Sequence, residues 1–530
     1  MRQALWPQDD SAWHAHEIEQ FFAGTLPMPL AVLLATNDAG VPVGFAELSI
    51  RAYAEDCVTD HVAYLEGWYV VPEARRQGVG RALVAAAEKW ARAQGCSEFG
   101  SDALIDNAIS AAAHRALGFV ETVQIRCFRK ALSVAVALLV MAGAAALPAQ
   151  QDSTREPIGT VRQIYDGTLT PEMAVNTFRN IDRLFPTRTV PRASNPLPLP
   201  PAATPLTSVS ISDGGRRYNL EDYLDLNRVT GLLVLKNGRI RLERYRFGNS
   251  ERTRWMSMSV AKSITSTLVG AALKQGYIGS LADPVTRYVP SLAGSAYEGV
   301  SVRDVLMMSS GVRWNETYTD PGSDRRRLLE AQISQIPGSA MTVMRSVSRA
   351  AAPGTVNNYS TGETQVAGEI VRRAVGRPLA TYLAERIWSR VGMEADANWW
   401  LDSPDGIEIG GSGFSATLRD YGRFGLFLLN GGVAGGEAIL PDGWIREATS
   451  PKVLRDGAAP LAYGYLWWTG TTPASQRDGA YTALGIYGQA LYINPVAQVV
   501  IVVWGAQAKP TGGDVINDWA FFDAVVEALR

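Results

Sequence analysis

The chain has 530 residues, enough for about two to four domains, and its formal net charge of −2 gives no sign of a nucleic-acid partner. The sequence beyond residue 130 contains no histidine or cysteine, which excludes a Ser-His-Asp triad, a cysteine nucleophile and a zinc site with His or Cys ligands. Any catalysis there must use Ser, Thr, Tyr, Lys or carboxylate side chains. The histidines and cysteines that precede it are His14, His16, His61, His114, Cys57, Cys96 and Cys127.

The first unit of the chain contains a predicted strand, a turn with two glycines and a predicted helix. Residues 64–71 are rich in aromatic and β-branched side chains and stop at a proline, which is typical of a strand. Apolar residues at helical spacing over 83–90 predict a helix that ends at Gly95. The turn between them, residues 75–80, reads RRQGVG. Its glycines let backbone N–H groups face outward at a helix N-terminus, which is an anion-binding arrangement.

This strand-turn-helix unit resembles the pyrophosphate loop of the GNAT N-acetyltransferases. Its spacing does not match a Walker loop, which needs Gly-Lys-Ser/Thr. The resemblance implies that acetyl-CoA is the co-substrate of the first unit. It also implies that the residues that bind this cofactor are Val70, Val71, Arg75, Arg76, Gln77, Gly78, Val79 and Gly80.

Three stretches extend this resemblance: LEGWYVVPEARRQGVG, SDALIDNAIS and HRALGFVET. Together they are similar to aminoglycoside 6′-N-acetyltransferases and cover nearly all of the first unit. The resemblance implies that Glu66 and Asp102 hold a cationic substrate, which needs acidic partners, and solvated surface charges are the alternative. His114 is expected to be structural, packed near Leu117 and Phe119.

The opening MRQALWPQDD matches the first helix of that family, and the strand that should precede the helix is missing. Either the start codon is misplaced or this domain has lost an edge strand. We therefore expect an acetyltransferase fold and keep two hypotheses for it, an active enzyme and an inactive remnant.

A run without charged residues, 131–147, divides the chain. Basic residues precede it and Pro148-Ala149 follows, so residues 131–149 are typical of a signal peptide or signal anchor. The positive-inside rule predicts one span of the inner membrane, with the first unit cytoplasmic and the rest periplasmic. Cleavage after Ala149, which would release the second unit, and a buried core helix are the alternatives. Residues 150–205 include NPLPLPPAATP and predict a stiff linker or a wrapping arm.

A serine near a lysine is one nucleophile arrangement that the second unit still allows. Its five lysines include only one, Lys262, with a serine three residues earlier, Ser259. This spacing places both side chains on one face of a helix that Ile264 and Leu268 continue as apolar. Burial would lower the pKa of the lysine and let it take the proton of the serine. Taken alone, a capping serine and a surface lysine would explain the pattern as well.

Five stretches in order add to this pair: YRFGNSERTRWMSMSVAKS, LADPVTRYVP, VSVRDVLMMSSGV, APGTVNNYSTGE and GGSGFSATLRDYGRFGLFLLNGG. They resemble the serine β-lactamase and penicillin-binding-protein superfamily, closest to class C β-lactamases and their esterase and amidase relatives. WNETYTDPGSD and GIYGQALYINP are similar to the 6-aminohexanoate-dimer hydrolase branch. The resemblance covers residues 230–530 and implies an antiparallel sheet flanked by helices, with an all-helical part.

The same resemblance implies the roles of the site residues. Ser259 is the nucleophile, Lys262 the base and Tyr359 the second proton carrier. The oxyanion hole is formed by the backbone N–H groups of Ser259 and of Gln489, which we expect on an edge strand. Tyr318 and Tyr487 contact the substrate. No metal and no cofactor are expected for this half of the chain.

Two departures from class C bear on the substrate. Thr361 stands where those enzymes have Asn, and Ile486-Tyr487-Gly488 replaces Lys-Thr-Gly. Without that cation the carboxylate of a β-lactam lacks its partner, so we expect an ester or a linear amide such as a 6-aminohexanoate oligomer. A β-lactamase, a D-Ala-D-Ala peptidase and a non-catalytic penicillin-binding module are the alternatives. Trp399-Trp400 and Trp467-Trp468 either line an apolar cleft or pack in the core.

The sequence therefore predicts a bifunctional α/β fusion of two enzymes that act on small molecules. We expect a GNAT domain with a mixed sheet over 1–130, the signal-like segment over 131–149, the linker or arm over 150–205 and the serine hydrolase over 206–530.

Overall fold

The structure is a computed structural model that describes residues 1–5, 14, 18–19, 21–22, 29–51, 54, 56–59, 61–103, 107–122, 156–455 and 460–530. The chain divides into two compact units, Met1–Ala146 and Leu147–Arg530, and each is considered by itself. We refer to them as the acetyltransferase unit and the hydrolase unit, for the folds that the sequence led us to expect.

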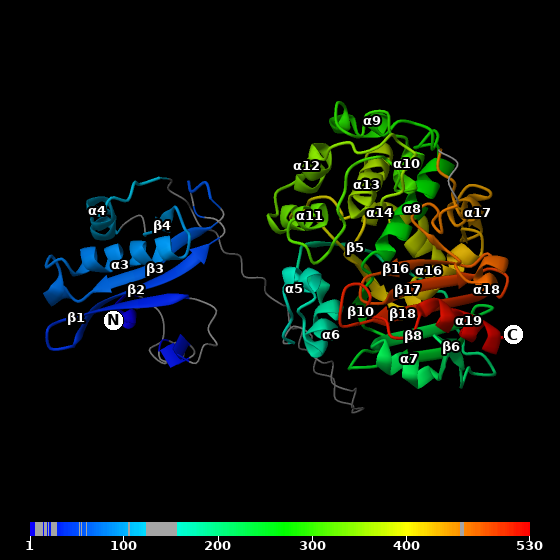
Figure 1. The fold of residues 1–530 in the computed structure, drawn as a ribbon, viewed down its shortest axis with the longest axis horizontal. Coiled ribbons are helices and arrows are strands. Elements are labelled where there is room, and N and C mark those ends of the chain that lie inside the picture. Colours follow the sequence, from blue (N-terminus) through cyan, green and yellow to red (C-terminus); the bar gives the residue numbers. More distant parts are fainter. Residues whose placement is uncertain are drawn as a thin grey trace. The chain divides into compact units, whose positions relative to one another are not determined.

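The acetyltransferase unit has a mixed sheet with the strand order β1-β2-β3-β4. β1, β2 and β3 are antiparallel neighbours, whereas β4 runs parallel to β3. Helix α3 packs across the first three strands (Figure 1), and its Leu83, Val84 and Ala87 share a core with Leu48 and Leu65 of the sheet. The described elements are α1 (Arg2–Leu5), β1 (Ala31–Thr36), β2 (Pro42–Arg51), β3 (Val62–Val70), η1 (Pro72–Ala74), α3 (Val79–Ala93), β4 (Phe99–Ser101) and α4 (Ala108–Ala116).

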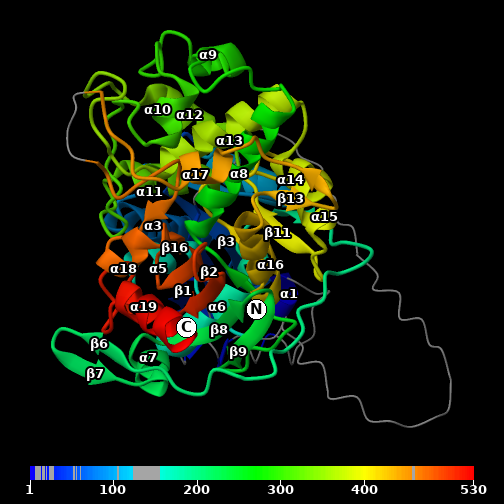
Figure 2. The ribbon, with the colours of Figure 1, turned by 90° about the vertical axis from the view of Figure 1, so that its right-hand side faces the viewer.

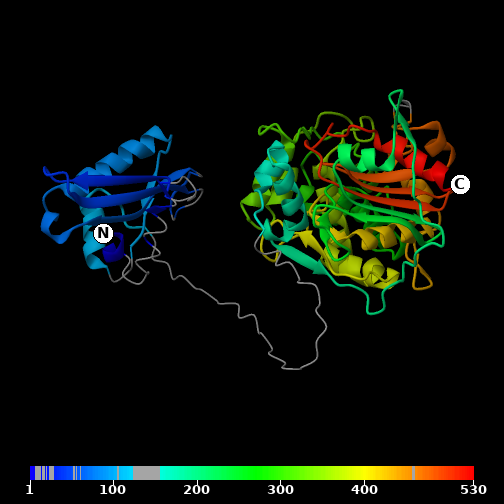
Figure 3. The ribbon, with the colours of Figure 1, turned by 90° about the horizontal axis from the view of Figure 1, so that it is seen from below.

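The hydrolase unit is built on an antiparallel sheet with the strand order β15-β16-β17-β18-β8-β9. Helices α7 and α19 cover one face and helices α8 and α16 cover the other (Figures 1 and 3). Strand β8 therefore reads as a continuous apolar run: Leu232 and Val234 face the α7 and α19 side, and Leu233 and Leu235 face the α8 and α16 side. Gly422 of α16 lets that helix approach closely, since a Cβ there would lie 2.6 Å from Leu233.

A second sheet, with the strand order β10-β12-β11-β5, and a helical part complete the hydrolase unit. Helices α9, α10, α12 and α13 gather beyond the end of the large sheet, and α8 connects them to it (Figure 2). The strands of the unit are β5 (Thr187–Val190), β6 (Ile211–Asp213), β7 (Arg216–Tyr218), β8 (Val229–Lys236), β9 (Arg239–Tyr245), β10 (Arg254–Met256), β11 (Ala397–Trp400), β12 (Phe414–Thr417), β13 (Val433–Ala434), β14 (Glu437–Ala438), β15 (Trp468–Thr469), β16 (Tyr481–Gly485), β17 (Gln489–Asn494) and β18 (Val499–Gly505).

The helices of the hydrolase unit connect these strands and supply most of the helical part. They are α5 (Val161–Asp166), α6 (Pro171–Arg179), η3 (Ile181–Arg183), α7 (Leu220–Leu226), α8 (Val260–Lys274), α9 (Val285–Tyr288), η4 (Pro290–Leu292), α10 (Val302–Leu306), α11 (Asp324–Ile333), α12 (Ser339–Ser346), α13 (Thr361–Val375), α14 (Leu379–Leu383), η5 (Ala384–Trp388), α15 (Ser389–Val391), α16 (Leu418–Leu429), α17 (Trp444–Ala448), α18 (Pro473–Arg477) and α19 (Asp518–Ala528). Most of them lie between β10 and β12 or between β12 and β16 in the sequence.

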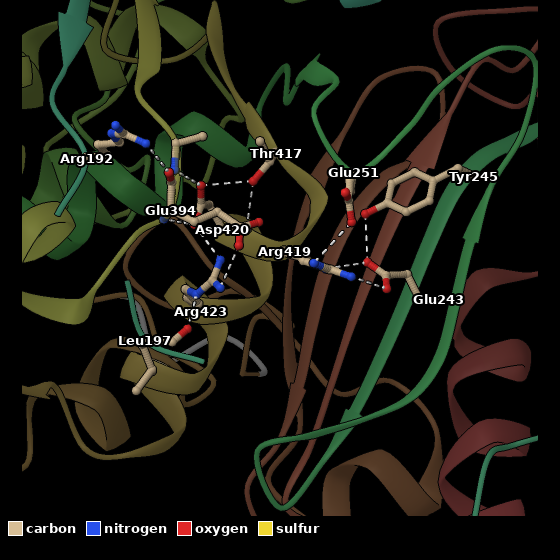
Figure 4. Close-up of polar contacts among 11 residues, drawn as sticks. Arg192, Leu197, Glu243, Tyr245, Glu251, Glu394, Thr417, Arg419, Asp420 and Arg423 are labelled. Atoms are coloured by element: carbon tan, nitrogen blue, oxygen red, sulfur yellow. Dashed lines mark hydrogen bonds and ion pairs between the residues drawn. The ribbon is translucent and has the colours of Figure 1, made fainter. Parts of the chain in front are cut away.

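Residues before 206 form part of the hydrolase unit. Strand β5 pairs with β11, and the Pro-rich stretch donates from Leu197 N to the Gly392 carbonyl over 2.7 Å. Arg423 of α16 holds the same stretch, since its guanidinium donates to the Leu197 carbonyl and to the carboxylates of Asp420 and Glu394 (Figure 4). The Pro-rich residues therefore lie along the unit as an arm.

Within the described residues, no helix is long and apolar enough to cross a bilayer. The signal-like segment that the sequence predicts over residues 131–149 lies outside the described residues.

Candidate active sites

Ser259 stands at the N-terminus of α8, directly after a strained residue. Met258 has φ +47°, a left-handed conformation that is uncommon for a side chain of this size. The Ser257 N–H donates to the Phe414 carbonyl over 2.8 Å and anchors this turn to strand β12. The Ser259 backbone N–H has no protein acceptor among the described residues, so it is free to donate to a developing oxyanion.

Lys262 lies one turn further along α8, and its ammonium group is buried against Ser259. Its Nζ is 2.8 Å from Ser259 Oγ, 2.9 Å from Thr361 Oγ1 and 3.0 Å from the Gly411 carbonyl oxygen. Burial lowers the pKa of Lys262 to about 7, although the negative charge of Glu316 acts in the opposite direction. A substantial fraction of the lysine is then neutral near pH 7 and able to accept a proton from the serine.

Tyr359 completes the cluster from the segment before α13. Its ring is stacked on Trp468 with centroids 5.6 Å apart, and Lys262 Nζ lies 5.3 Å from the centre of that ring. Burial and the charge of Glu316 raise the pKa of Tyr359, while a hydrogen bond with Ser259 lowers it in part. The phenol therefore keeps its proton near neutral pH, and the structure brings Ser259, Lys262 and Tyr359 together.

Glu316 is a member of the site that the sequence did not single out. Its Oε2 accepts from Trp314 Nε1 over 2.5 Å and from the Thr361 backbone N–H over 2.9 Å, and its Oε1 accepts from Thr361 Oγ1. Thr361 also accepts from Lys262, so a hydrogen-bonded chain runs from the lysine through the threonine to the carboxylate. Its one sequence signal was its place inside WNETYTDPGSD, because no spacing along the chain relates it to Lys262.

The expectation of an edge strand for Gln489 is wrong. Gln489 begins β17, which lies between β16 and β18 inside the sheet. Its side-chain amide is used within the core, where it accepts from Trp255 Nε1 and donates to the Gly505 carbonyl. The backbone that approaches the nucleophile is the end of β16, since a Cβ on Gly485 would lie 2.5 Å from the Ser257 carbonyl oxygen.

The two predicted substrate tyrosines have different surroundings. Tyr318 is partly exposed, and its ring lies 6.2 Å from that of Tyr165 on α5. Tyr487 is buried in the turn between β16 and β17, and its hydroxyl donates to the Ile164 carbonyl. The prediction that Tyr487 contacts the substrate is therefore wrong, because the side chain attaches α5 to the sheet.

The tryptophan pairs serve mainly as core. Trp399, Trp400 and Trp467 are buried, and the first two donate to the carbonyls of Ile409 and Ile181. Trp468 differs, since it is partly exposed and stacks on Tyr359. Within the described part of the chain, no group of three or more His, Cys, Asp or Glu side chains is arranged to hold a metal ion.

The predicted cofactor loop of the acetyltransferase unit joins β3 to α3. The backbone N–H groups of residues 76–80 have no protein acceptor among the described residues, so five consecutive donors remain available at the helix N-terminus. This is the arrangement that a pyrophosphate needs. The predicted residues all lie here: Val70 at the end of β3, then Val71, Arg75, Arg76, Gln77, Gly78, and Val79 and Gly80 in the first turn of α3.

The two glycines of this loop are needed for different reasons. Gly78 is the N-cap of α3 with φ +87°, and a Cβ there would meet nothing within 4 Å. Gly80 is required by packing within the protein, because a Cβ there would lie 2.9 Å from the Trp68 ring. A side chain at residue 78 would therefore be strained by its backbone conformation and not by a clash.

The predicted substrate carboxylates of this unit are both hydrogen-bonded. Glu66 accepts from Arg51 Nε over 3.0 Å and from Arg51 Nη2 over 2.5 Å, so a cation of the protein already pairs with it. Asp102 accepts from the Tyr64 hydroxyl over 3.1 Å. His114 has the structural surroundings that we expected, with Nε2 3.0 Å from Ser101 Oγ and its ring packed on Phe119.

The geometry defines a serine hydrolase with a buried lysine, joined in one chain to an acetyltransferase unit. A model of the β-lactamase family matches residues 227–525, and a model of the acetyltransferase (GNAT) family matches residues 1–119. The chain therefore belongs to the β-lactamase family through its hydrolase unit and to the GNAT family through its acetyltransferase unit. It is a fusion of two enzyme families, as the sequence predicted.

Individual relatives agree with this assignment. Aminoglycoside N(6′)-acetyltransferase type 1 of Klebsiella aerogenes is 57% identical over 25% of this chain and 87% of its own length. The 6-aminohexanoate-dimer hydrolase of Paenarthrobacter ureafaciens is 31% identical over 63% of this chain and 85% of its own length. A solved structure from Bacillus anthracis, assigned as a 6-aminohexanoate-dimer hydrolase, has 25% identity and a TM-score of 0.60, covering 67% of this chain and 92% of that one.

Proposed function

We propose that the hydrolase unit cleaves esters or linear amides through an acyl-enzyme on Ser259. The observation that carries the proposal is the 2.8 Å contact between Ser259 Oγ and the Nζ of Lys262, whose pKa burial lowers to about 7. No histidine exists in this half of the chain to replace the lysine.

The reaction follows from the positions of the three side chains. Neutral Lys262 takes the proton of Ser259 while Oγ attacks the substrate carbonyl carbon. The Ser259 backbone N–H and a backbone N–H at the end of β16 stabilise the oxyanion. Tyr359 passes the proton to the leaving amine or alcohol as its bond to the carbonyl carbon breaks. Water, activated by the same groups, then attacks the acyl-enzyme and releases the acid.

The substrate is a linear amide or ester of the 6-aminohexanoate oligomer type. The relatives named for this activity support the choice, together with the absence of a lysine from residues 486–488. That stretch holds the buried Tyr487, which offers no charge to the carboxylate of a β-lactam. We therefore expect penicillins and cephalosporins to be poor substrates.

The acetyltransferase unit transfers an acetyl group from acetyl-CoA to an amine of an aminoglycoside. When bound, the cofactor supplies the acetyl group as a thioester. The free N–H groups of residues 76–80 would bind its pyrophosphate, and Glu66 and Asp102 would orient the ammonium groups of the substrate. Because Arg51 already pairs with Glu66, the substrate would have to displace or share that contact.

The two activities belong to different compartments in this proposal. Acetyl-CoA is a cytoplasmic metabolite, and the uncharged residues 131–147 follow basic residues in the sequence. We place the acetyltransferase unit in the cytoplasm and the hydrolase unit in the periplasm, either anchored in the inner membrane or released by cleavage after Ala149.

One experiment tests the hydrolase assignment. The full chain is incubated with 6-aminohexanoate dimer, p-nitrophenyl acetate and nitrocefin in parallel, with the Ser259→Ala variant as the control. We expect turnover of the first two substrates, little turnover of nitrocefin, and no turnover by the variant. Faster cleavage of nitrocefin than of the dimer would contradict the substrate assignment.

A further inference from the structure

Three consecutive arginines follow Asp324 in the first turn of helix α11, and they differ in their partners. Arg326 is buried and pairs with Asp166 over 2.5 Å, whereas Arg327 is exposed and reaches Ser346 Oγ. Arg325 is only 3% exposed, and it forms no ion pair with any carboxylate in the described ranges of the chain. It is a buried cation without a direct carboxylate partner among the described residues.

The direct contacts of Arg325 fix its position and are all with neutral groups. Its guanidinium donates to the Tyr165 hydroxyl and lies 4.3 Å from the centre of the Tyr165 ring. Its backbone N–H donates to the Asn315 carbonyl over 3.0 Å. Neither contact brings a negative charge, and a buried guanidinium without one is unfavourable. An anion that binds at this point would remove that cost.

Arg325 lies near the segment of the hydrolase unit that carries Glu316 and Tyr318. The ring of its partner Tyr165 is 6.2 Å from the ring of Tyr318, which is partly exposed, and Asn315 directly precedes Glu316. The charge of Arg325 also lowers the pKa values of Lys262 and Tyr359, although burial is the largest influence on both. The guanidinium is therefore within electrostatic reach of the reacting groups.

We infer that Arg325 binds a carboxylate of the substrate and so selects linear amides and esters that carry one. The inference deepens the proposed hydrolase function and rests on it. A guanidinium offers paired N–H donors that match the two oxygens of a carboxylate. Helix α5 supplies Tyr165, which holds the guanidinium in place. In this arrangement helix α11, and not the sheet, supplies the cation that residues 486–488 lack.

The test compares two substrates that differ only in charge, 6-aminohexanoate dimer and its terminal carboxamide. Arg325→Met should raise KM for the carboxylate substrate by about 10- to 100-fold, the usual worth of one charge-assisted hydrogen bond. KM for the carboxamide should stay within about twofold in that variant. Arg325→Lys should restore part of the affinity for the carboxylate substrate. Arg327→Met removes the same charge from the exposed neighbour and should change neither value.

A measurement on the unchanged protein covers the case in which Arg325→Met fails to fold. Hexanoate should inhibit p-nitrophenyl acetate hydrolysis at concentrations at which hexanamide does not. Equal inhibition by the two compounds, or equal KM values for the two dimers in the wild type, would overturn the role of Arg325. Such a result would leave the proposed hydrolase function standing, because turnover of p-nitrophenyl acetate tests that function separately.

Discussion

The two candidate sites of this chain use different chemical groups, backbone N–H donors in one and side chains in the other. In the acetyltransferase unit the candidate cofactor site is a single loop, and its donors are the backbone N–H groups of residues 76–80. In the hydrolase unit the site is made of side chains from separate segments, the buried Ser259 and Lys262 and the half-buried Glu316 and Tyr359. A backbone site tolerates most side chains and depends on a few glycines, whereas a side-chain site depends on burial and on each neighbouring charge.

The largest expected effect is the loss of hydrolase activity when Lys262 is removed. Lys262→Ala should reduce ester turnover by about 10²- to 10⁴-fold, because the nucleophile then has no base within reach. Steady-state hydrolysis of p-nitrophenyl acetate measures it. Lys274→Ala is the matched control, since Lys274 ends the same helix but is partly exposed and far along the chain from the serine. Equal losses in the two variants would mean that the buried position has no special role.

In the cofactor loop, acetyl-CoA affinity should depend on the backbone conformation and not on a charged side chain. Gly78→Ala forces a side chain into a left-handed conformation and into the open space at the N–H groups, so we expect acetyl-CoA affinity to fall about tenfold. Calorimetric titration measures the affinity. Gly40→Ala is the control, because Gly40 has φ +77°, a similar open surrounding and no place in the loop. If both variants bind alike, the loop does not hold the cofactor.

The charge of Glu316 should be visible in the pH dependence of the hydrolase rate. Its charge raises the pKa of Lys262, so Glu316→Gln should lower that pKa further. Because the neutral lysine is the active form, the acid limb of the rate, expected near pH 7 in the wild type, should move to lower pH. The side-chain amide oxygen can still accept from Thr361, so a merely structural role would leave the limb in place. An unmoved limb with reduced turnover would therefore contradict the electrostatic role.

The smallest expected effect is a change in stability from Glu363, a buried acid that takes no part in the proposed reaction. Burial raises the pKa of Glu363 to about 7, although hydrogen bonds from Ser310 and Tyr297 oppose this. An exposed glutamate titrates near pH 4.3, so the folded chain holds this proton longer than the unfolded chain does. Stability contributed by the proton is present at low pH and is lost as the pH rises toward 7.

Glu363→Gln removes this titration with little change of shape. One carboxylate oxygen of Glu363 accepts from Ser310 and Tyr297, and the other has no partner among the described residues. The variant should match the wild type in melting temperature near pH 4 and exceed it by a few degrees near pH 8. Calorimetry at the two pH values measures this. A constant difference between the two proteins at both pH values would contradict the titration.

Local patterns were readable from the sequence, and contacts between distant segments were not. The strand, turn and helix around residues 75–80 and the spacing of Ser259 and Lys262 depend on neighbours in the chain, and the structure places them as expected. Both families and the fusion were also recognised correctly. Glu316 and Arg325 were missed because their partners, Thr361 and Tyr165, lie 45 and 160 residues away.

The errors have a related cause. Gln489 and Tyr487 were assigned by position within a motif, and the motif did not reveal that residues 486–488 form a turn between two interior strands. The turn buries Tyr487 against α5, a helix that precedes it by more than 300 residues, as the 323-residue separation of its bond to Ile164 shows. The start of the hydrolase unit was set at residue 206 because the sequence does not show that α5, α6 and β5 pack on the later segments.

The central claim is that Ser259 is a nucleophile activated by a buried Lys262. The most direct measurement is the rate at which a fluorophosphonate labels the full chain at different pH values, followed by mass spectrometry of the labelled peptide. The account predicts one adduct, on Ser259, with a labelling rate that rises through a midpoint near pH 7 and falls at least 100-fold in Lys262→Ala, the lower end of the worth of a general base. Labelling at another residue, or a Ser259 rate that is the same with and without Lys262, would contradict it.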